Sequence, residues 1–331
     1  MFKLVMMLGI TDPRLKQALG EWAQIAPGLG LDSRLFRAKL IWQKKEPDRS
    51  HVVIRLRGPR GLILKRVFTA PQGGNSNQSI AAQRDAFERL VPYDKAHAPE
   101  VLFANDTGNI VVMVEASGKT LNDHLSGGRA HGQMLKRTGA WLAAFHVSSE
   151  TEKRIYQPRF MVNHAERMAS GIEAGQISVA DPQRFVTCCR LVSQHAAKVT
   201  DQATISAAKH GDFNLRNILL GPNGETGLDF KPQSSAPVGF DIARILMDYA
   251  ELFQPTAELE PGTLLSKATL DGFFRGYNVV TRDDPAVTFL PFVQLLNDWR
   301  LIPSDPARRS WRQTERYKAI TALAQNGFGV P

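Results

Sequence analysis

Short runs of alternating apolar and polar residues dominate the first third of the chain, and this pattern predicts half-buried β-strands. Three such runs follow one another at about 35–43, 51–57 and 61–68. A Gly-Pro-Arg-Gly turn sequence at 58–61 separates the last two, so we expect them to form a β-hairpin. Ahead of them, apolar residues recur every three or four positions over 12–29, which predicts an amphipathic helix.

One helix and two more strands complete this segment. The helical pattern covers 79–91, after a polar loop at 73–78. Strand patterns follow at 99–103 and 109–114, joined by an Asn-Asp-Thr-Gly turn. The order β-β-β-α-β-β predicts a small, mostly antiparallel five-stranded sheet that ends near residue 115.

Helical periodicity replaces the strand pattern in the rest of the chain, apart from a stretch of short strands and turns at 203–231. The expected helices cover 131–147, 161–174, 182–199, 239–254, 264–280 and 310–326. The sequence therefore predicts an α+β protein with a small antiparallel-sheet lobe, residues 1–115, and a larger, mainly helical lobe, residues 116–331.

Composition places the chain among ordinary globular proteins. It has 331 residues, of which 43% are hydrophobic and 22% charged. No apolar run reaches the roughly 18 to 20 residues that a membrane span requires. A short apolar run over residues 1–10 resembles a signal peptide only faintly, because no small-residue cleavage site follows it. The adjacent Cys188 and Cys189 are too few for a disulfide framework or a zinc site, so we expect helix-packing cysteines and a cytoplasmic protein.

The net charge is +9, and most of the excess lies in the N-terminal half. A basic half can indicate nucleic-acid binding, but these residues alternate with acidic ones and form no known nucleic-acid motif. A small ligand that carries phosphate would also favour such a charge. We therefore expect no nucleic-acid partner.

The strongest chemical signal is the sequence His-Gly-Asp-Phe-Asn-Leu-Arg-Asn at 210–217. Two short apolar segments follow, separated by a Gly-Pro-Asn-Gly turn, and the second leads into Asp229. Such segments form a hairpin, which would bring Asn217 and Asp229 to the same end. Ordinary turn-forming Asn and Asp residues are the alternative interpretation.

These residue types suit phosphoryl transfer. Asp212 can accept the proton of an attacking hydroxyl, and Asn217 and Asp229 offer hard oxygen ligands to Mg²⁺. A cation from the other lobe must reach the phosphates, and Lys65 on the third strand is placed for that, with Arg66 as the alternative.

Taken in order, these elements resemble the aminoglycoside phosphotransferase superfamily of small-molecule kinases, which includes choline and fructosamine kinases. The matching segments are the lysine strand at 61–66, a hinge and helix start at 111–121, a helix at 139–146, the loop at 210–217 with Asp229, and an Asp-Ile-Ala segment at 237–244. The resemblance implies a bilobal protein-kinase-like fold, with ATP and Mg²⁺ as cofactors and a small-molecule hydroxyl as acceptor.

The resemblance also implies roles for individual residues. Asp212 would be the catalytic base, and Lys65, Met113 and Glu115 would bind the nucleotide. Asn217 and Asp229 would hold the metal. His210, His146 and Asp241 would support the catalytic loop without taking part in the chemistry.

Three features depart from the family pattern. The connection at 44–50 has no glycine to cover the phosphates, and Lys231 stands after Asp229-Phe230 where glycine or an acid is usual. The helix partner of Lys65 is open between Gln83, at the aligned position, and the nearby Asp85 and Glu88. These departures keep a catalytically silent nucleotide-binding or scaffold protein as the alternative. A protein kinase is disfavoured, because Asp-Phe-Gly and Ala-Pro-Glu motifs are missing.

The acceptor pocket is expected in the helical lobe. No acidic cluster stands out there in sequence, and the last segment is basic, either as a solvated helix face or as an anion site. Arginine pairs well with phosphate and carboxylate. We therefore expect a sugar, an amino alcohol or a cell-envelope precursor rather than an aminoglycoside.

Overall fold

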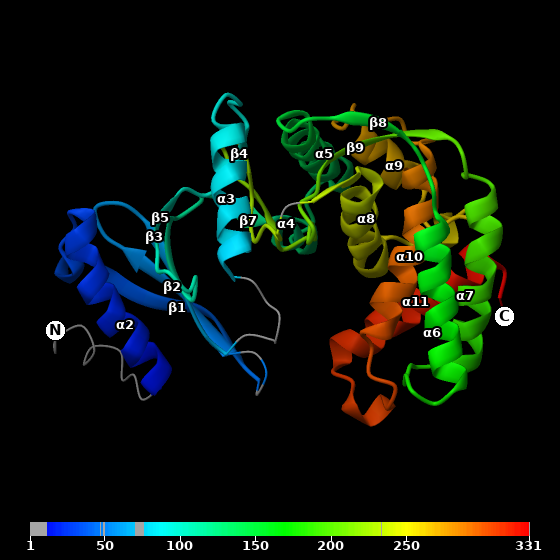
Figure 1. The fold of residues 1–331 in the computed structure, drawn as a ribbon, viewed down its shortest axis with the longest axis horizontal. Helices are drawn as coiled ribbons and strands as arrows, with labels where there is room; N and C mark the ends of the chain where they lie inside the picture. The colour runs from blue at the N-terminus through cyan, green and yellow to red at the C-terminus, as the bar shows by residue number, and fades with distance from the viewer. Residues whose placement is uncertain (1–11, 47, 49, 70–75, 233, 331) are drawn as a thin grey trace.

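A computed structural model describes residues 12–46, 48, 50–69, 76–232 and 234–330. These residues form a small lobe built on a sheet and a larger helical lobe (Figure 1). The α+β bilobal, protein-kinase-like fold predicted from the sequence is confirmed. The faint signal-peptide pattern at 1–10 and the first half of the loop expected at 73–78 lie outside the described residues.

The small lobe is a five-stranded antiparallel sheet in the order β1-β2-β3-β6-β5. Its elements are α2 (Pro13–Ile25), β1 (Arg37–Lys45), β2 (Ser50–Arg57), β3 (Leu62–Thr69), β5 (Val101–Ala104) and β6 (Ile110–Val114). The hairpin predicted between β2 and β3 is present. Leu15, Leu19 and Trp22 line one side of α2 and belong to the same buried cluster as the inward residues of β2 and β3.

Helix α3 (Ser76–Leu90) lies between the lobes in Figure 1. Its buried residues Ala82, Ala86 and Leu90 belong to the core of the large lobe. The loop expected at 73–78 is wrong for residues 76–78, which form the first turn of this helix. The lobe boundary expected at residue 115 stays a prediction.

The large lobe is mainly helical. Its helices are α4 (Leu121–Ser126), α5 (His131–Val147), α6 (Arg159–Glu173), α7 (Pro182–Ala197), α8 (Gly239–Phe253), α9 (Lys267–Phe274), α10 (Pro285–Arg300) and α11 (Trp311–Phe328). Helix α10 was not predicted from the sequence, and α9 is shorter than the helix expected at 264–280. Helix α10 is buried on nearly every side and contains Pro285 and Pro291, so it lacks the amphipathic period that marks a surface helix. The two cysteines are buried in α7, as expected.

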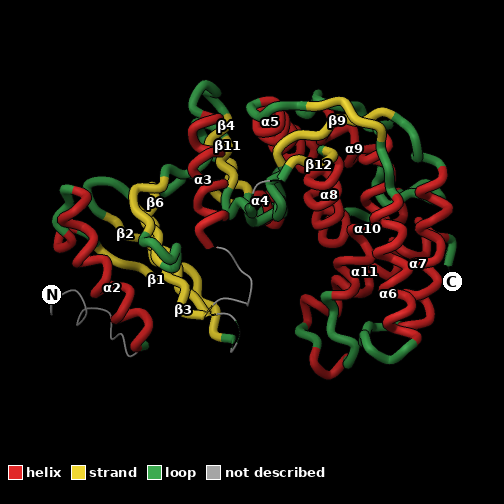
Figure 2. The backbone as a smooth tube through the Cα atoms, viewed as in Figure 1, coloured by secondary structure: helices red, strands yellow, loops and turns green. Residues whose placement is uncertain are grey.

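Two small sheets flank the loop at 210–217, which begins after β9 and ends at β10. One has the order β4-β11-β10-β7, from Ala96–His97, Glu225–Gly227, Ile218–Leu220 and Lys119–Thr120. The other contains β8 (Glu152–Ile155), β9 (Ala203–Ala208) and β12 (Ser235–Pro237). Figure 2 shows β4 and β11 beside α3, in the middle of the molecule. The predicted hairpin of β10 and β11 is thus held on both edges by segments near the lobe junction. None of the described helices has the length and apolar character needed to cross a lipid bilayer.

Candidate active site

The loop at 210–217 connects β9 to β10, and its side chains alternate between core and surface. His210, Phe213 and Leu215 are fully buried, whereas Asp212 is one-third exposed. Phe213 stacks on Trp141 of α5, with ring centroids 5.2 Å apart. Burying three side chains of so short a loop fixes its backbone, and this orients the polar residues between them toward solvent.

Asp241, at the start of α8, holds the loop from below. Its carboxylate accepts hydrogen bonds from the amides of His210 at 2.7 Å and Gly211 at 3.0 Å. His146 of α5 lies 3.3 Å from the same carboxylate and 2.8 Å from the Tyr277 hydroxyl. Burial would raise the pKa of Asp241, but these hydrogen bonds and the neighbouring histidines hold it below its usual value. Asp241 and His146 thus lie beneath the loop, as expected, and that they take no part in the chemistry stays a prediction.

His210 is also a structural residue. Its Nδ1 faces the amide of Asp212 at 3.4 Å, and its ring lies 4.5 Å from that of Phe230, between centroids. Burial lowers its pKa, so the imidazole is neutral near pH 7. Nε2 is buried and has no hydrogen-bond partner among the described residues. This enclosed ring has no path for moving a proton to or from a substrate.

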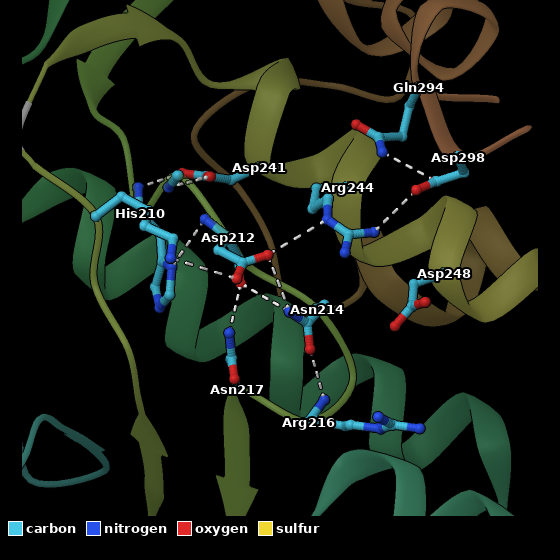
Figure 3. Close-up of polar contacts among 12 residues, drawn as sticks. His210, Asp212, Asn214, Arg216, Asn217, Asp241, Arg244, Asp248, Gln294 and Asp298 are labelled. Atoms are coloured by element: carbon cyan, nitrogen blue, oxygen red, sulfur yellow. Dashed lines mark hydrogen bonds and ion pairs between the residues drawn. The ribbon is translucent and has the colours of Figure 1, made fainter. Parts of the chain in front are cut away.

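Asp212 lies at the centre of the polar groups drawn in Figure 3. The amide of Asn214 donates to its Oδ1 at 3.1 Å, and Arg244 Nε lies 3.6 Å from the same oxygen. Lys231 Nζ lies 3.9 Å from Oδ2. Arg216 points away from this carboxylate. Asp212 is therefore a carboxylate at the surface of the loop, held by one amide and flanked by two cations.

Asn217 and Asp229 lie at the same end of the hairpin, as predicted, because Leu228 donates its amide to the Asn217 carbonyl at 2.8 Å. The Asn217 side-chain nitrogen donates to the backbone carbonyl of Asp212 at 2.9 Å. Because this hydrogen bond uses the side-chain nitrogen, the side-chain oxygen of Asn217 is the atom that can act as a metal ligand. Asp229 has a φ of 58°, in the left-handed region that non-glycine residues rarely adopt. Such conformations persist where the surrounding structure enforces them, commonly at functional sites.

Lys65 of β3 reaches across the lobes to Asp229, with 2.7 Å between Nζ and Oδ1. The positive charge of Lys65 holds the pKa of Asp229 below its usual value. The neighbouring Arg66 is instead bound to Glu21 of α2, at 2.7 and 3.0 Å. The strand register therefore turns Lys65 toward the candidate metal ligands and Arg66 away from them.

Two of the three residues weighed as helix partners of Lys65 have other contacts in this structure, and the third, Glu88, is exposed. Gln83 is buried and its amide donates to the Pro99 carbonyl at 2.8 Å. Asp85 accepts from Arg89, one turn further along α3, at 2.5 Å. The carboxylate that Lys65 contacts comes from the large lobe, at Asp229.

Met113 and Glu115, expected to bind the nucleotide, lie at the end of β6. Met113 pairs with Ile63 and Val101 on the two neighbouring strands. Glu115 donates its amide to the Gly61 carbonyl at 3.0 Å, and its carboxylate meets Arg55 at 2.6 Å. Both the amide and the carboxylate of Glu115 are thus engaged within the small lobe.

The donor set suits Mg²⁺ better than a transition metal. The described residues contain no group of three or more His, Cys, Asp or Glu that could hold a metal ion. Asn217 and Asp229 would offer one amide oxygen and one carboxylate. Mg²⁺ is commonly bound by one or two such groups, with waters and substrate phosphates completing its octahedral shell.

Sequence reasoning missed a charged cluster beside the loop. It consists of Asp248 and Glu251 on α8, Asp298 on α10, Arg244 on α8 and Arg316 on α11. No acidic cluster stands out in the sequence of this lobe, yet three acids meet here in the structure. Arg316 contacts all three, so this member of the basic last segment does not lie on a solvated helix face. The sequence did contain a signal of this cluster. Its members on α8, together with Asp241, recur every three or four residues and so share one helix face.

The cluster contains more acidic than basic side chains, and burial favours the protonated, neutral form of the excess acid. Burial raises the pKa of Glu251 well above 4.5, and the neighbouring carboxylate of Asp298 raises it further, against the pull of Arg316. Burial also raises the pKa of Asp298. Glu251 is therefore the group most inclined to hold a proton, and its buried Oε1 has no hydrogen-bond partner among the described residues.

Comparison with known proteins finds similar structures but no relative by sequence. No family model matches the chain, and no curated protein matches it in sequence. Solved structures do match over nearly the whole chain. A choline/ethanolamine kinase family protein from Mesorhizobium loti is 15% identical, with 86% of this chain and 87% of that chain covered and a TM-score of 0.53.

Two further neighbours are similar to the same extent. Choline kinase from Cryptosporidium parvum is 10% identical, with coverage of 94% and 95% and a TM-score of 0.56. An amicoumacin kinase, solved with AMP-PNP and Ca²⁺, is 13% identical, with coverage of 97% and 98% and a TM-score of 0.56. The chain therefore has the fold found in choline kinase and antibiotic phosphotransferases, as the sequence resemblance implied.

Proposed function

We propose that this protein is a kinase that transfers the γ-phosphoryl group of ATP, with Mg²⁺, to a hydroxyl group of a small molecule. The observation that carries the proposal is the ion pair of Lys65 and Asp229, at 2.7 Å. It joins the two lobes beside Asn217 and Asp212, so a phosphate-binding cation, two metal ligands and a base converge on one place.

Each residue has a defined part in the reaction. Asp212 accepts the proton as the hydroxyl oxygen attacks the γ-phosphorus; the bond to the bridging oxygen breaks and ADP leaves. When the nucleotide binds, Lys65 leaves Asp229 and contacts the phosphates instead. Asn217 and Asp229 hold Mg²⁺, which when bound neutralises charge on the phosphate oxygens.

A structural neighbour with a bound nucleotide supports ATP as the donor. Spectinomycin phosphotransferase, solved with ADP and spectinomycin, is 14% identical, with coverage of 92% and 97% and a TM-score of 0.54. Similarity at this level concerns the fold, so the nucleotide assignment for this chain rests equally on Lys65, Asn217 and Asp229.

The charged cluster argues against a polycationic acceptor. Its acids are already neutralised from within the chain: Arg316 contacts Asp248 at 3.1 Å and Glu251 at 2.5 Å, and Arg244 lies 3.6 Å from Asp298. An aminoglycoside would have to compete with these arginines. A neutral or anionic sugar or cell-envelope precursor meets no such competition, and an amino alcohol has a single positive charge where an aminoglycoside has several.

Gln83 favours a second candidate function, a catalytically silent nucleotide-binding or scaffold protein. Its amide is bonded to Pro99, so the helix position aligned with the family's glutamate places no carboxylate next to Lys65. Turnover distinguishes this candidate from the kinase.

Thermal unfolding with ATP or ADP, each with Mg²⁺ or EDTA, tests the proposal. A ligand at 100 times its Kd adds about 2.7 kcal/mol, which raises Tm by several degrees. A kinase should show a shift that requires Mg²⁺, and Asp229→Asn should abolish it. Asp212→Asn is the matched variant: it should keep the shift and lose ADP production with a panel of hydroxyl compounds. A shift indifferent to Mg²⁺ would favour a silent nucleotide-binding protein. No shift at millimolar nucleotide would contradict the kinase and favour a scaffold protein.

A further inference from the structure

Lys231 lies on the candidate site although it belongs to none of the motifs. It follows Asp229 and Phe230, and its amide donates to the carbonyl of His210 at 3.0 Å. This bond places the backbone of Lys231 alongside the catalytic loop, next to Gly211.

Gly211 makes this close approach possible. Its φ is +83°, and a Cβ added to it would lie 2.7 Å from the Cβ of Lys231. Only glycine leaves that space open, so the loop backbone and the stem of Lys231 pack directly against each other. The start of the lysine side chain is thereby fixed, and its flexible end is the part free to move.

The ammonium group of Lys231 lies beside the candidate base, 3.9 Å from Asp212 Oδ2. Lys231 also follows the candidate metal ligand Asp229 by two residues in the chain. The side chain is 53% exposed. An exposed ion pair at this distance adds at most about 1 kcal/mol to stability. Fold stability therefore gives no reason for a lysine here, whereas its position beside the candidate base does.

We propose that Lys231 is a catalytic residue that neutralises negative charge on the phosphoryl group as it passes from the nucleotide to the acceptor. The inference rests on the proposed kinase function. In that reaction the phosphoryl group travels from the metal side, at Asp229, toward the base, Asp212. Its transition state spreads charge over three equatorial oxygens, which positioned cations stabilise.

The step leaves the bonding of Lys231 unchanged. The acceptor oxygen bonds to phosphorus, the bond to the bridging oxygen breaks, and the proton goes to Asp212. Lys231 keeps its protons, and its ammonium group moves from the Asp212 carboxylate to the phosphoryl oxygens. The same movement frees the oxygen of Asp212 that receives the proton.

Two other cations near the loop have further partners. Arg244 lies 3.6 Å from both Asp212 and Asp298, so it is shared between two carboxylates. The Lys209 ammonium lies over the ring of Phe240, 5.5 Å from its centroid. Lys209 is therefore a matched control: a lysine next to the loop at 210–217 whose charge is directed at an aromatic ring.

The experiment measures binding of MgADP, with and without aluminium fluoride as a mimic of the phosphoryl group in transfer, by calorimetry. It compares the wild type with Lys231→Met, Lys231→Arg and Lys209→Met. In the wild type, aluminium fluoride should tighten MgADP binding. Lys231→Met should bind MgADP within about twofold of the wild type and lose at least about tenfold of the gain from aluminium fluoride. Lys231→Arg and Lys209→Met should retain most of that gain.

The outcomes separate this inference from the proposed function. A wild type that binds no MgADP overturns the kinase proposal itself. A wild type that binds MgADP, with an undiminished aluminium fluoride effect in Lys231→Met, overturns only the role of Lys231. The same holds if Lys231→Met weakens MgADP alone as much as the aluminium fluoride complex, because the lysine would then be a ground-state nucleotide ligand. Equal losses in Lys209→Met and Lys231→Met would also overturn it, since the effect would then be one of general charge.

Discussion

Arg316 and Asp248 are 68 residues apart, yet Nη2 of the arginine donates to Oδ1 of the aspartate at 3.1 Å. The other oxygen of Asp248 accepts the backbone amide of Leu215, in the catalytic loop, at 3.1 Å. Through these two bonds the last helix of the chain, α11, is connected to the loop that contains Asp212. The same guanidinium also holds Glu251, at 2.5 Å.

Arg316→Met should destabilise the protein by about 3 kcal/mol, because removing one partner leaves buried acids uncompensated. It should also lower turnover, since Asp248 loses the group that orients it toward the Leu215 amide. Urea unfolding and ADP production measure the two effects. Arg312→Met, on the exposed side of α11, is the control and should change stability by less than about 0.5 kcal/mol. Unchanged stability in Arg316→Met would show that the cluster does not hold the helix to the loop.

Glu251→Gln should change how stability depends on pH. Burial raises the pKa of Glu251 above 4.5, so the folded protein binds this proton more tightly than the unfolded chain. The contribution of Glu251 to the free energy of unfolding is therefore fully present below pH 4.5, and it is lost as the pH rises through the pKa of the folded protein. Glutamine is neutral throughout and can still accept from Arg316. The variant should gain stability relative to the wild type as the pH rises above 4.5; parallel curves of Tm against pH would contradict the raised pKa.

Gln83→Glu introduces the glutamate of the family pattern, but it should not create an ion pair with Lys65. The buried amide donates to the Pro99 carbonyl, and a carboxylate cannot. We expect a loss of about 1 to 3 kcal/mol, with no gain in nucleotide affinity. Glu88→Gln, on the exposed side of α3, should leave both quantities unchanged. Tighter MgADP binding by Gln83→Glu would show that Lys65 can turn to α3.

Asp229→Ala should be less stable than Asp229→Asn by about 1 kcal/mol, although both remove the ion pair with Lys65. The backbone at Asp229 is left-handed, a conformation that asparagine tolerates and alanine does not. The pair itself adds little, because the Asp229 side chain is 55% exposed. Equal unfolding free energies for the two variants would mean that the loop relaxes when the carboxylate is removed.

Local patterns predicted most of the fold. The β2–β3 hairpin, the β10–β11 hairpin and α5 follow from turn residues and periodicity, which act between near neighbours. Helix α10 was missed because burial on all sides removes the polar face that such reasoning needs. The candidate site residues from Asp212 to Asp229 were found for the same local reason, since their spacing lies within one loop and one hairpin.

Which charged groups meet could not be predicted in the same way. Lys65 contacts Asp229, Arg316 contacts Asp248, and Lys231 lies beside Asp212. The first two pairings join lysine or arginine to an acid far along the chain, and any of several basic residues could have satisfied each one. The sequence by itself determined the strands, most helices and the residue types of the site, because these depend on neighbours within a few positions. Only the tertiary structure decided the ion pairs, the buried cluster and its shifted pKa values, because these depend on how helices and lobes pack and on how much water that packing excludes.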